Sequence, residues 1–532
     1  MRVLLVTGQL AEHVVYDSAS QQSHVQFSIK VLSSPVAALL TPQFIAEKLR
    51  GEDLGRYDCV IVPGMVREST SIIEDVIKLP VFKGTKYASD IPVLFEALGQ
   101  VELSKVDAAD AILSEHIQRR SMGLLEQAEH PDESVFEKQW NMIIGGGDGN
   151  RLLVGRDFPM RVVAEILDGP LLSDDELVKK ARYYVKCGAK IIDIGMLAGK
   201  PRPDDVKRMV TLLKRRPGVP ISVDALCPED LEAGLKFGAD MILSLNSQNI
   251  DRIRYPGHLS DVAVVVIPDP PESGKTISLE ESVRKRVESL EENVESVSQI
   301  GFSKIIADPI LDPLIFPGTV PSIIVTHEFS KRHPDVPLMF GLGNITELID
   351  ADSIGVNATL AGIAQELNAN LLLTTEGSPK TKGAVSELAT ACKMMYLANR
   401  RISSPKDLGI DLLRLKEKRR RDVPHDGSSE EKEGIQVIEA RRGQEPNTDP
   451  GGFFKINVDQ DSKEIVVSHF NPEAEELDFV VRGSGPLEIR DTLTRLGVIS
   501  TLEHAFYLGV EIEKAKIASW INRSYYQDEE VF

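Results

Sequence analysis

Eight short apolar runs alternate with amphipathic stretches of helix length between residues 161 and 375. The runs are rich in β-branched residues and cover residues 161–167, 190–195, 220–225, 240–245, 262–267, 303–309, 337–343 and 370–375. Continuous apolar strands separated by helices are typical of a parallel sheet that is buried on both faces. Eight such units in about 215 residues have the size of a (β/α)8 barrel. The pattern therefore predicts an α/β protein with a central TIM barrel, which we place at residues 136–405.

Shorter patterns on both sides of the barrel predict two smaller domains. Residues 1–135 predict a small N-terminal α/β domain and a helical connection, with strands at 2–8, 27–32, 36–41 and 59–64 and a helix at 44–50. Residues 406–450 are charged and contain Pro, Gly and Ser, which is the composition of a linker. Residues 451–532 predict a small C-terminal α+β domain, with strands at 452–459, 463–470 and 477–483 and helices at 486–496 and 499–517.

Composition and charge restrict the class of protein. The 532 residues carry a net charge of −20, whereas phosphate binding by nucleic-acid-binding proteins needs a basic face, so no nucleic-acid partner is expected. The four cysteines include no CxxC pair, which favours a reducing compartment over a disulfide framework. The chain starts on an apolar strand without the basic region of a signal peptide, and no apolar run approaches the roughly 20 residues of a membrane span. We therefore expect a cytoplasmic protein with no membrane segment.

Polar residues follow the predicted barrel strands at the ends that carry the catalytic groups of TIM barrels. They are Asp168, Asp193, Asp224, Asn246, Asp269, Asp308, Asn344 and Glu376. An ionised carboxylate has two acceptor oxygens, so it can take paired N–H donors from a flat aminopyrimidinone ring such as that of a pterin. A helix cap is the alternative role for Asp224 and Asp308, since Asp is common at that position.

Other kinds of chemistry have less support in the sequence. Mg²⁺ would suit the carboxylates, but His258, His327 and His333 lack the spacing of zinc ligands, and we assign no metal site. The glycine-rich run at 145–152 lacks the GxxxxGK[ST] order of a phosphate loop. No Ser or Cys lies in a nucleophile elbow, so covalent catalysis by the protein is not indicated.

Four of the strand motifs resemble those of a known superfamily. The segments IIDIG, PISVDA, GADMILSLN and KIIADP, in this order and spacing, resemble the pterin-binding barrel of dihydropteroate synthases and of pterin-dependent methyltransferases. This resemblance implies that Asp224 and Asp308 bind a pterin and that an amide, matched by Asn246, lies near the fourth strand end. The TGQLAE segment (7–12) and the C-terminal segment 499–518 are similar to archaeal dihydropteroate synthase-like proteins.

The departures from the synthase pattern bear on the reaction. Leu167–Pro170, Gly343–Ile345 and Thr374–Glu376 stand where synthases have an Asn-Val-Thr-Pro loop, a Ser-Arg-Lys segment and an Arg-x-His segment. Acidic residues there would repel a pyrophosphate, for which cations are the usual partners. The segment around Asn344 is closer to the methyltransferase branch, in which an amide assists methyl transfer. We therefore assign catalytic roles to Asn246, Asn344 and Asp193, and substrate-binding roles to Asp224, Asp308, Asp168, Arg202 and Lys380.

The sequence thus predicts a pterin-binding enzyme that transfers a methyl or pterin-methyl group. Its substrate or cofactor would be a reduced pterin of the tetrahydromethanopterin or tetrahydrofolate type. One alternative is the condensation of a pterin-methyl pyrophosphate with an arylamine. The other is a non-catalytic pterin-binding scaffold that docks a corrinoid protein or another partner. The resemblance also implies a homodimer.

Overall fold

The computed structural model describes residues 1–146, 150–215, 218–255, 257–271, 278–418, 440, 449–472 and 476–531. The chain divides into two compact units, Met1–Lys416 and Glu417–Phe532. Most of the predicted linker at 406–450 falls outside the described residues. In the part of the chain that is described, no helix has the length and apolar character needed to cross a membrane.

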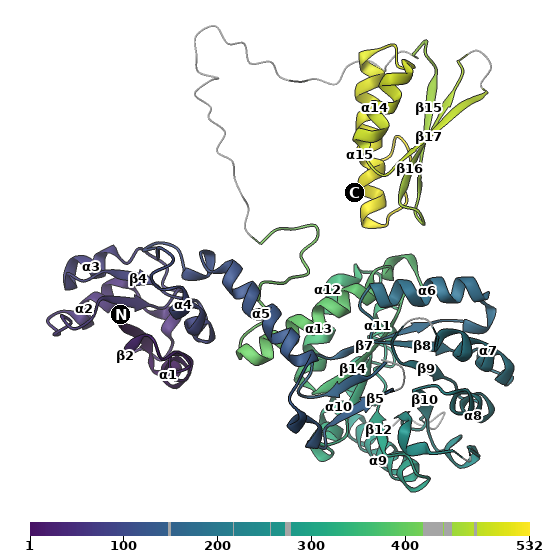
Figure 1. Cartoon of the computed structure of the whole chain (residues 1–532), viewed down its shortest axis with the longest axis horizontal. Helices are drawn as coiled ribbons and strands as arrows, with labels where there is room; N and C mark the ends of the chain where they lie inside the picture. Colours follow the sequence, from purple (N-terminus) through teal and green to yellow (C-terminus); the bar gives the residue numbers. More distant parts are fainter. Residues whose placement is uncertain are drawn as a thin grey trace. The chain divides into compact units, whose positions relative to one another are not determined.

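The N-terminal domain is a parallel sheet with helices on both faces (Figure 1). Within the described residues its strand order is β2-β1-β3-β4, with bounds β1 (Arg2–Gly8), β2 (Gln26–Leu32), β3 (Cys59–Val62) and β4 (Val81–Lys83). The helices are α1 (Glu12–Ala19), α2 (Pro42–Leu49), α3 (Ser71–Ile77) and α4 (Ile91–Ala97). One apolar core joins α1 and α4 to the sheet and another joins α2 and α3, so the domain is a doubly wound α/β unit.

One predicted strand of this domain is wrong, and one strand was missed. Residues 36–41 form no strand; they contain a short 3-10 helix, Ala37–Leu39. The preceding loop is tied to the end of β1, because the N–H groups of Gln9 and Leu10 donate to the carbonyl oxygens of Ser34 (2.9 Å) and Pro35 (3.1 Å). The missed strand, β4, has three residues, too few to show a period.

The barrel is closed by eight parallel strands in the described residues, and each lies where an apolar run predicted it (Figure 1). The strands are β7 (Arg161–Ile166), β8 (Ile191–Gly195), β9 (Ile221–Asp224), β10 (Met241–Leu245), β11 (Ala263–Val266), β12 (Lys304–Ala307), β13 (Leu338–Gly341) and β14 (Ala369–Thr375). The surrounding helices are α6 (Asp174–Lys186), α7 (Pro203–Leu213), α8 (Pro228–Phe237), α9 (Leu279–Gln299), α10 (Thr319–Arg332), α11 (Gly343–Thr346), α12 (Ser353–Glu366) and α13 (Ala384–Arg401). The predicted (β/α)8 barrel is confirmed.

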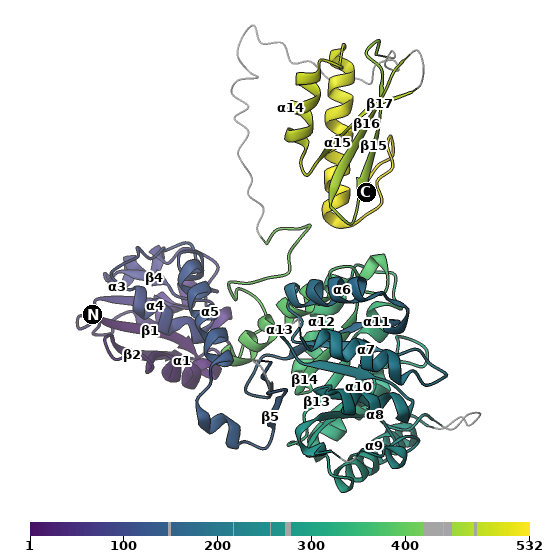
Figure 2. The ribbon, with the colours of Figure 1, turned by 45° about the vertical axis from the view of Figure 1, so that its right-hand side comes forward.

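A hairpin that the sequence did not predict closes the amino-terminal end of the barrel. Helix α5 (Ser114–Glu129) leads from the N-terminal domain to the antiparallel strands β5 (Asn141–Ile144) and β6 (Leu152–Gly155). Ile144 and Val154 are fully buried and belong to the same apolar cluster as the inward-facing Val163 and Ile191 of the barrel strands. The hairpin therefore completes the interior core at the end opposite to the strand carboxyl ends (Figure 2).

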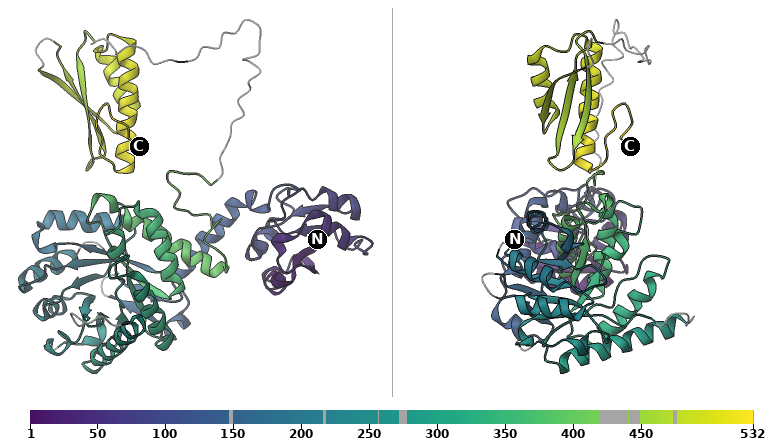
Figure 3. Two further views of the ribbon diagram at one scale, coloured as in Figure 1. Left: turned by 180° about the vertical axis from the view of Figure 1, so that it is seen from behind. Right: turned by 90° about the vertical axis from the view of Figure 1, so that its right-hand side faces the viewer.

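The second unit contains an antiparallel sheet covered by two helices, as predicted (Figure 3). Its elements are β15 (Phe453–Asp459), β16 (Glu464–Phe470), β17 (Leu477–Gly483), α14 (Pro486–Leu496) and α15 (Leu502–Ile521). Alternate strand residues such as Ile465 and Val467 are buried against Ile489 and Ile512 of the helices. The fold thus consists of the predicted barrel with a small α/β domain before it and a small α+β domain after it, while the predicted domain boundaries stay predictions.

Candidate functional site

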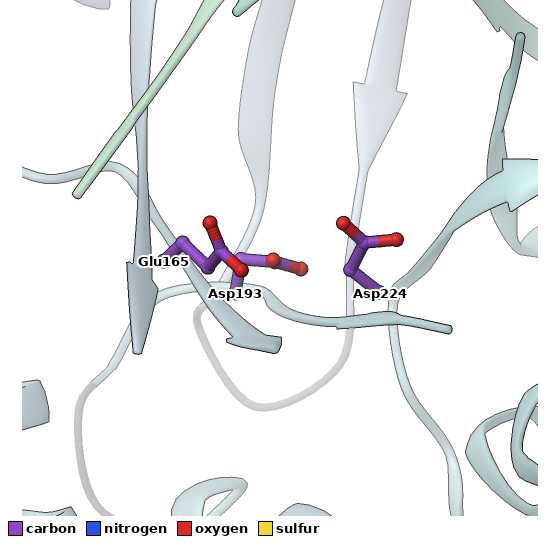
Figure 4. A group of neighbouring side chains, drawn as sticks. All are labelled: Glu165, Asp193 and Asp224. Atoms are coloured by element: carbon purple, nitrogen blue, oxygen red, sulfur yellow. The ribbon is translucent and has the colours of Figure 1, made fainter. Parts of the chain in front are cut away.

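Three carboxylates from neighbouring strands meet inside the carboxyl end of the barrel. Val163 and Ile191 face the interior, and residues two positions later on a strand face the same way, so Glu165 and Asp193 also point inward. These two residues are direct partners in the β7–β8 register, and Asp224 ends the next strand, β9. One oxygen from each carboxylate lies within 4.8 Å of the others (Figure 4). The strand register therefore assembles an acidic cluster, Glu165, Asp193 and Asp224.

Two serines hold this acidic cluster from the interior of the barrel. The Ser222 hydroxyl donates to Asp193 Oδ1 and the Ser244 hydroxyl donates to Asp224 Oδ1, both at 2.5 Å. Ser244 has a left-handed backbone with φ of 71°, at a register shift in β10, and conformations of this kind are concentrated at functional sites. Asp193 is fully buried, and its Oδ2 has no hydrogen-bond partner. The cluster therefore keeps acceptor capacity that the protein itself does not use.

Crowding and burial favour the protonated forms of these acids. Burial, followed by the charges of Asp224 and Asp168, raises the pKa of Glu165 to about 7. Burial, followed by the charges of Asp224 and Glu165, raises the pKa of Asp193 well above its usual range. Burial also raises the pKa of Asp224, although the hydrogen bond from Ser244 opposes this shift. Like charges at this distance disfavour simultaneous ionisation, so the cluster takes up protons more readily than separate carboxyls would.

Asp308 is a fourth acid of the mouth; it lies directly after β12 and is buried, with 8% exposure. Its Oδ1 accepts the N–H of Ile310 at 2.8 Å, and burial raises its pKa to about 7. Arg286 of α9 donates to the carbonyl oxygen of Ile310 and pairs with Asp312, so it fixes the loop that carries Asp308. The charge of Asp224 also raises the pKa of Asp308, so the two acids lie within electrostatic range of each other.

The two predicted catalytic amides are engaged in loop contacts. Asn246 is 4% exposed after β10, and its Oδ1 accepts the N–H of Gln248 at 3.0 Å. Asn344 lies after β13 and donates from Nδ2 to the carbonyl oxygen of Leu311 at 2.9 Å, which ties the loop after β13 to the loop after β12. Both amides therefore shape loops at the barrel mouth, and their catalytic roles stay predictions.

The remaining predicted substrate-binding residues are placed differently from one another. Asp168 is exposed, has a left-handed φ of 52°, and is close enough to raise the pKa of Glu165. The Arg202 side chain is 44% exposed and lies 3.5 Å from Asp205 of the following helix, while its backbone N–H donates to Asp230. Lys380 donates to Asp350 at 3.0 Å and to the carbonyl oxygen of Ile349 at 2.8 Å. The two cations thus have protein partners outside the acidic cluster.

The sequence did not predict Glu165 as a site residue, nor the side chains that surround Glu376. Glu165 lies inside a predicted strand and not at its end, and the signal was a charged residue in a strand expected to be buried on both faces. The Glu376 side chain is 2% exposed and accepts the Tyr183 hydroxyl at 3.1 Å, with Lys382 Nζ at 4.0 Å. Lys180 is also within electrostatic range of Glu376, and burial lowers its pKa. The end of the eighth strand therefore combines the carboxylate of Glu376 with nearby lysine side chains.

The donor set restricts the ligands of the site. The partner-free Asp193 Oδ2, beside oxygens of Glu165 and Asp224, would suit a hard cation such as Mg²⁺, which prefers carboxylates. The same carboxylates, with Asp308, would suit a ring rich in N–H groups, since each ionised carboxylate accepts a pair of them.

Comparison with known proteins identifies three regions of the chain. Residues 166–349 match a model of pterin binding enzymes, and this range contains Asp193, Asp224, Asn246, Asp308 and Asn344. Residues 1–86 match a family of unknown function (DUF6513), and residues 448–528 match a family described as PterinBD-DUF4346. The region similar to pterin binding enzymes thus lies within the barrel.

Relatives with known sequences or structures extend the comparison. The chain is similar to a dihydropteroate synthase from Xanthomonas albilineans solved with 7,8-dihydropteroate (21% identity, 45% of this chain, 92% of that chain, TM-score 0.35). It is also similar to one from Yersinia pestis solved with a pterine-sulfa conjugate (18% identity, 49% and 99% coverage, TM-score 0.37). An uncharacterized protein of Methanocaldococcus jannaschii is 38% identical over 543 residues, which span 100% of this chain and 99% of the relative. Since this likeness runs the length of both chains, the chain belongs to the same family as this uncharacterized protein, and its barrel matches the model of pterin binding enzymes.

Proposed function

We propose that this protein binds a reduced pterin at the acidic barrel mouth and transfers its methyl group. Asp224 and Asp308 would each accept N–H groups of the aminopyrimidinone ring. The observation that carries the proposal is the pair of carboxyls at the ends of β9 and β12, half-buried Asp224 and buried Asp308, within the region that matches pterin binding enzymes. The pterin would be of the tetrahydromethanopterin or tetrahydrofolate type.

Methyl transfer from N5 needs a proton at that nitrogen. When the acceptor attacks the methyl carbon, the electron pair of the C–N bond returns to N5, and a protonated N5 then leaves as a neutral amine. Asp193 supports such a step, because it is fully buried and burial beside two other acids raises its pKa, which favours the protonated form that can donate. Asn246 would orient the ring, and Asn344 would hold the loop beside it.

The rim of the mouth supports a protein as the methyl acceptor. Large apolar side chains are exposed on the loops that follow four of the barrel strands: Leu171 (68%), Leu226 (62%), Ile315 (95%), Phe316 (87%) and Leu348 (69%). Exposed apolar groups gathered around one opening mark an interaction surface. We infer a docking face for a partner that carries the acceptor, such as a corrinoid protein.

Condensation of a pterin-methyl pyrophosphate with an arylamine is the second candidate. Lys382 lies beside Glu376, and Lys180 is close to both, so cations are available at the eighth strand end. Glu376 is buried and lies beside Lys382, so it would repel a pyrophosphate less than the sequence alone suggested.

Three measurements on the full chain separate these candidates. Calorimetric titration with methyltetrahydrofolate and with methyltetrahydromethanopterin should give binding to at least one of them. Transfer of a labelled methyl group to a free corrinoid supports the favoured reaction, whereas pyrophosphate release with 4-aminobenzoate supports condensation. Binding without either reaction would leave the scaffold role, and the absence of pterin binding would refute the proposal.

A further inference from the structure

A polar cavity of about 100 Å³ lies where the N-terminal domain meets the barrel. It is lined by residues of α5, of the loop before α4 and of the C-terminal end of α13. Helix α5 contacts α13 at this place (Figure 2). The lining includes the three arginines Arg120, Arg400 and Arg401 but a single carboxylate, Asp90. The cavity is thus locally basic in a chain of net charge −20.

Arg401 is the central group of this cavity and its side chain is 8% exposed. Its guanidinium pairs with Asp90, donates to the carbonyl oxygens of Lys406 (3.1 Å) and Asp407 (2.9 Å), and lies over the Tyr87 ring. Its Nε–H is buried and has no acceptor. A buried donor of a charged group without a partner is expensive, so it calls for a ligand or water that the protein itself does not supply.

The other polar groups of the lining are also mainly donors. The Ser89 hydroxyl is buried and has no hydrogen-bond partner. Arg120 reaches Gln21 Oε1 at 3.4 Å, and Arg400 donates to the carbonyl oxygen of Asp157 at 3.1 Å. The Arg400 guanidinium also lies 3.8 Å from the Asp157 carboxylate. Among the described residues, no carboxylate forms an ion pair with Arg120. The lining therefore offers more N–H and O–H groups than acceptors.

We propose that this cavity binds a small oxyanion of the phosphate class, either free phosphate or the terminal phosphate of a metabolite. One water takes about 30 Å³ in the liquid, so the cavity has room for about three waters or one tetrahedral oxyanion. Planar guanidinium groups match the oxygens of phosphate geometrically, and an anion also neutralises charge, which water does not. The oxyanion would accept from Arg401 Nε, Ser89 Oγ and Arg120.

The position of the cavity separates it from the barrel mouth. Helix α13 follows β14 and runs back toward the amino-terminal ends of the strands, so Arg401 lies at the opposite end from the acidic cluster. Ser89 belongs to the N-terminal domain and Arg401 to the last barrel helix. A bound oxyanion would therefore link the N-terminal domain to the barrel and stabilise their contact.

The test is titration of the full chain with inorganic phosphate and, separately, with glycerol phosphate, with chloride at matched ionic strength as the reference. We expect saturable binding of one oxyanion per chain and a rise in melting temperature that chloride does not give. Tighter binding of glycerol phosphate would identify a metabolite as the source, and binding of inorganic phosphate alone would identify the free ion.

Two variants on one helix make the test specific. Arg120→Gln should weaken oxyanion binding at least tenfold, whereas Arg119→Gln, which removes the same charge from an exposed neighbour, should leave it unchanged. Ser89→Ala gives a second variant that does not disturb the Arg401–Asp90 pair. Equal losses in Arg119→Gln and Arg120→Gln would show nonspecific attraction and overturn the proposal, as would a melting temperature that responds only to ionic strength.

Discussion

Acidic side chains are enclosed at one end of the barrel and a basic side chain beside the other end. The free-energy cost of burying a charge is lowered in a different way at each end. At the carboxyl end, Glu165, Asp193 and Asp224 crowd together, and raised pKa values allow them to take up protons. Beside the amino end, Arg401 is equally enclosed, but a guanidinium keeps its charge at any physiological pH. The acids can therefore be protonated when the site is empty and ionised when an N–H donor binds. The arginine, in contrast, needs an anionic partner at all times. This difference agrees with the roles proposed for them, a reactive site at the mouth and an anchoring site beside the amino end.

Removing the arginine should have the largest effect on stability. Arg401→Met leaves Asp90 buried without a cation, and breaking one side of a buried ion pair costs about 3–5 kcal/mol. Thermal and denaturant unfolding should show this loss. The double variant Arg401→Met with Asp90→Leu should recover much of it; if the double variant is no more stable than the single one, the pair is not the source of the loss.

Asp224→Asn should have the next largest effect, on ligand binding. The amide keeps the shape but turns an N–H donor toward the donors of the ring, at a cost of about 2–4 kcal/mol in affinity. The melting temperature should stay equal or rise, since one of three crowded acids is neutralised. Calorimetric titration with a tetrahydropterin measures the loss, with Asp175→Asn, an exposed aspartate of α6, as the control. Unchanged affinity would remove Asp224 from the pterin site.

The pH dependence of binding should report on Asp308. Its pKa of about 7 means that the ionised acceptor is lost as the pH falls below 7, so pterin affinity should drop by up to about tenfold per pH unit there. The other acids of the mouth add to this dependence. Asp308→Asn should bind weakly and with a flatter pH profile. A profile of the variant as steep as that of the native chain would assign the dependence to another acid.

A smaller effect is expected from Glu165→Gln, on stability. The folded-state pKa of Glu165 is raised to about 7, so ionisation is opposed by the fold, and the native chain loses stability as the pH rises from about 4.5 to 7. The variant lacks this loss and should be more stable by about 1–3 kcal/mol at pH 8. Unfolding at pH 5 and pH 8 measures the difference, and Glu292→Gln on the exposed face of α9 should show none.

Deleting residues 436–532 should have the smallest effect on either end of the barrel. Both sites belong to the first compact unit, Met1–Lys416. The truncated chain should therefore keep its pterin and oxyanion affinities. Aggregation or a much lower melting temperature would show that the C-terminal domain contributes to the stability of the barrel.

The sequence predicted the barrel because its strands are buried on both faces and show uninterrupted apolar runs. Strands of three or four residues are too short to give such a signal, which explains the missed strand β4 and the missed β5–β6 hairpin. Strand ends predicted Asp193, Asp224 and Asp308 as mouth residues, since a parallel sheet brings its carboxyl ends together. The partners of Arg202 and Lys380 could not be predicted, because they depend on how loops fold over one another.

The basic cavity also could not be predicted from the sequence, because it depends on how distant segments pack together. Arg400 and Arg401 are adjacent charges that look solvated in the sequence, while Ser89 and Asp90 are more than 300 positions earlier. Only the packing of α5 against α13 brings them together.

The β5–β6 hairpin closes the amino-terminal end of the barrel interior. With Ile144 and Val154 packed into the floor, the short route from the acidic cluster to water runs through the mouth. A ligand bound at the mouth would block this route. Water would then reach the carboxyl groups and serine hydroxyls of the interior more slowly in the liganded protein than in the free one.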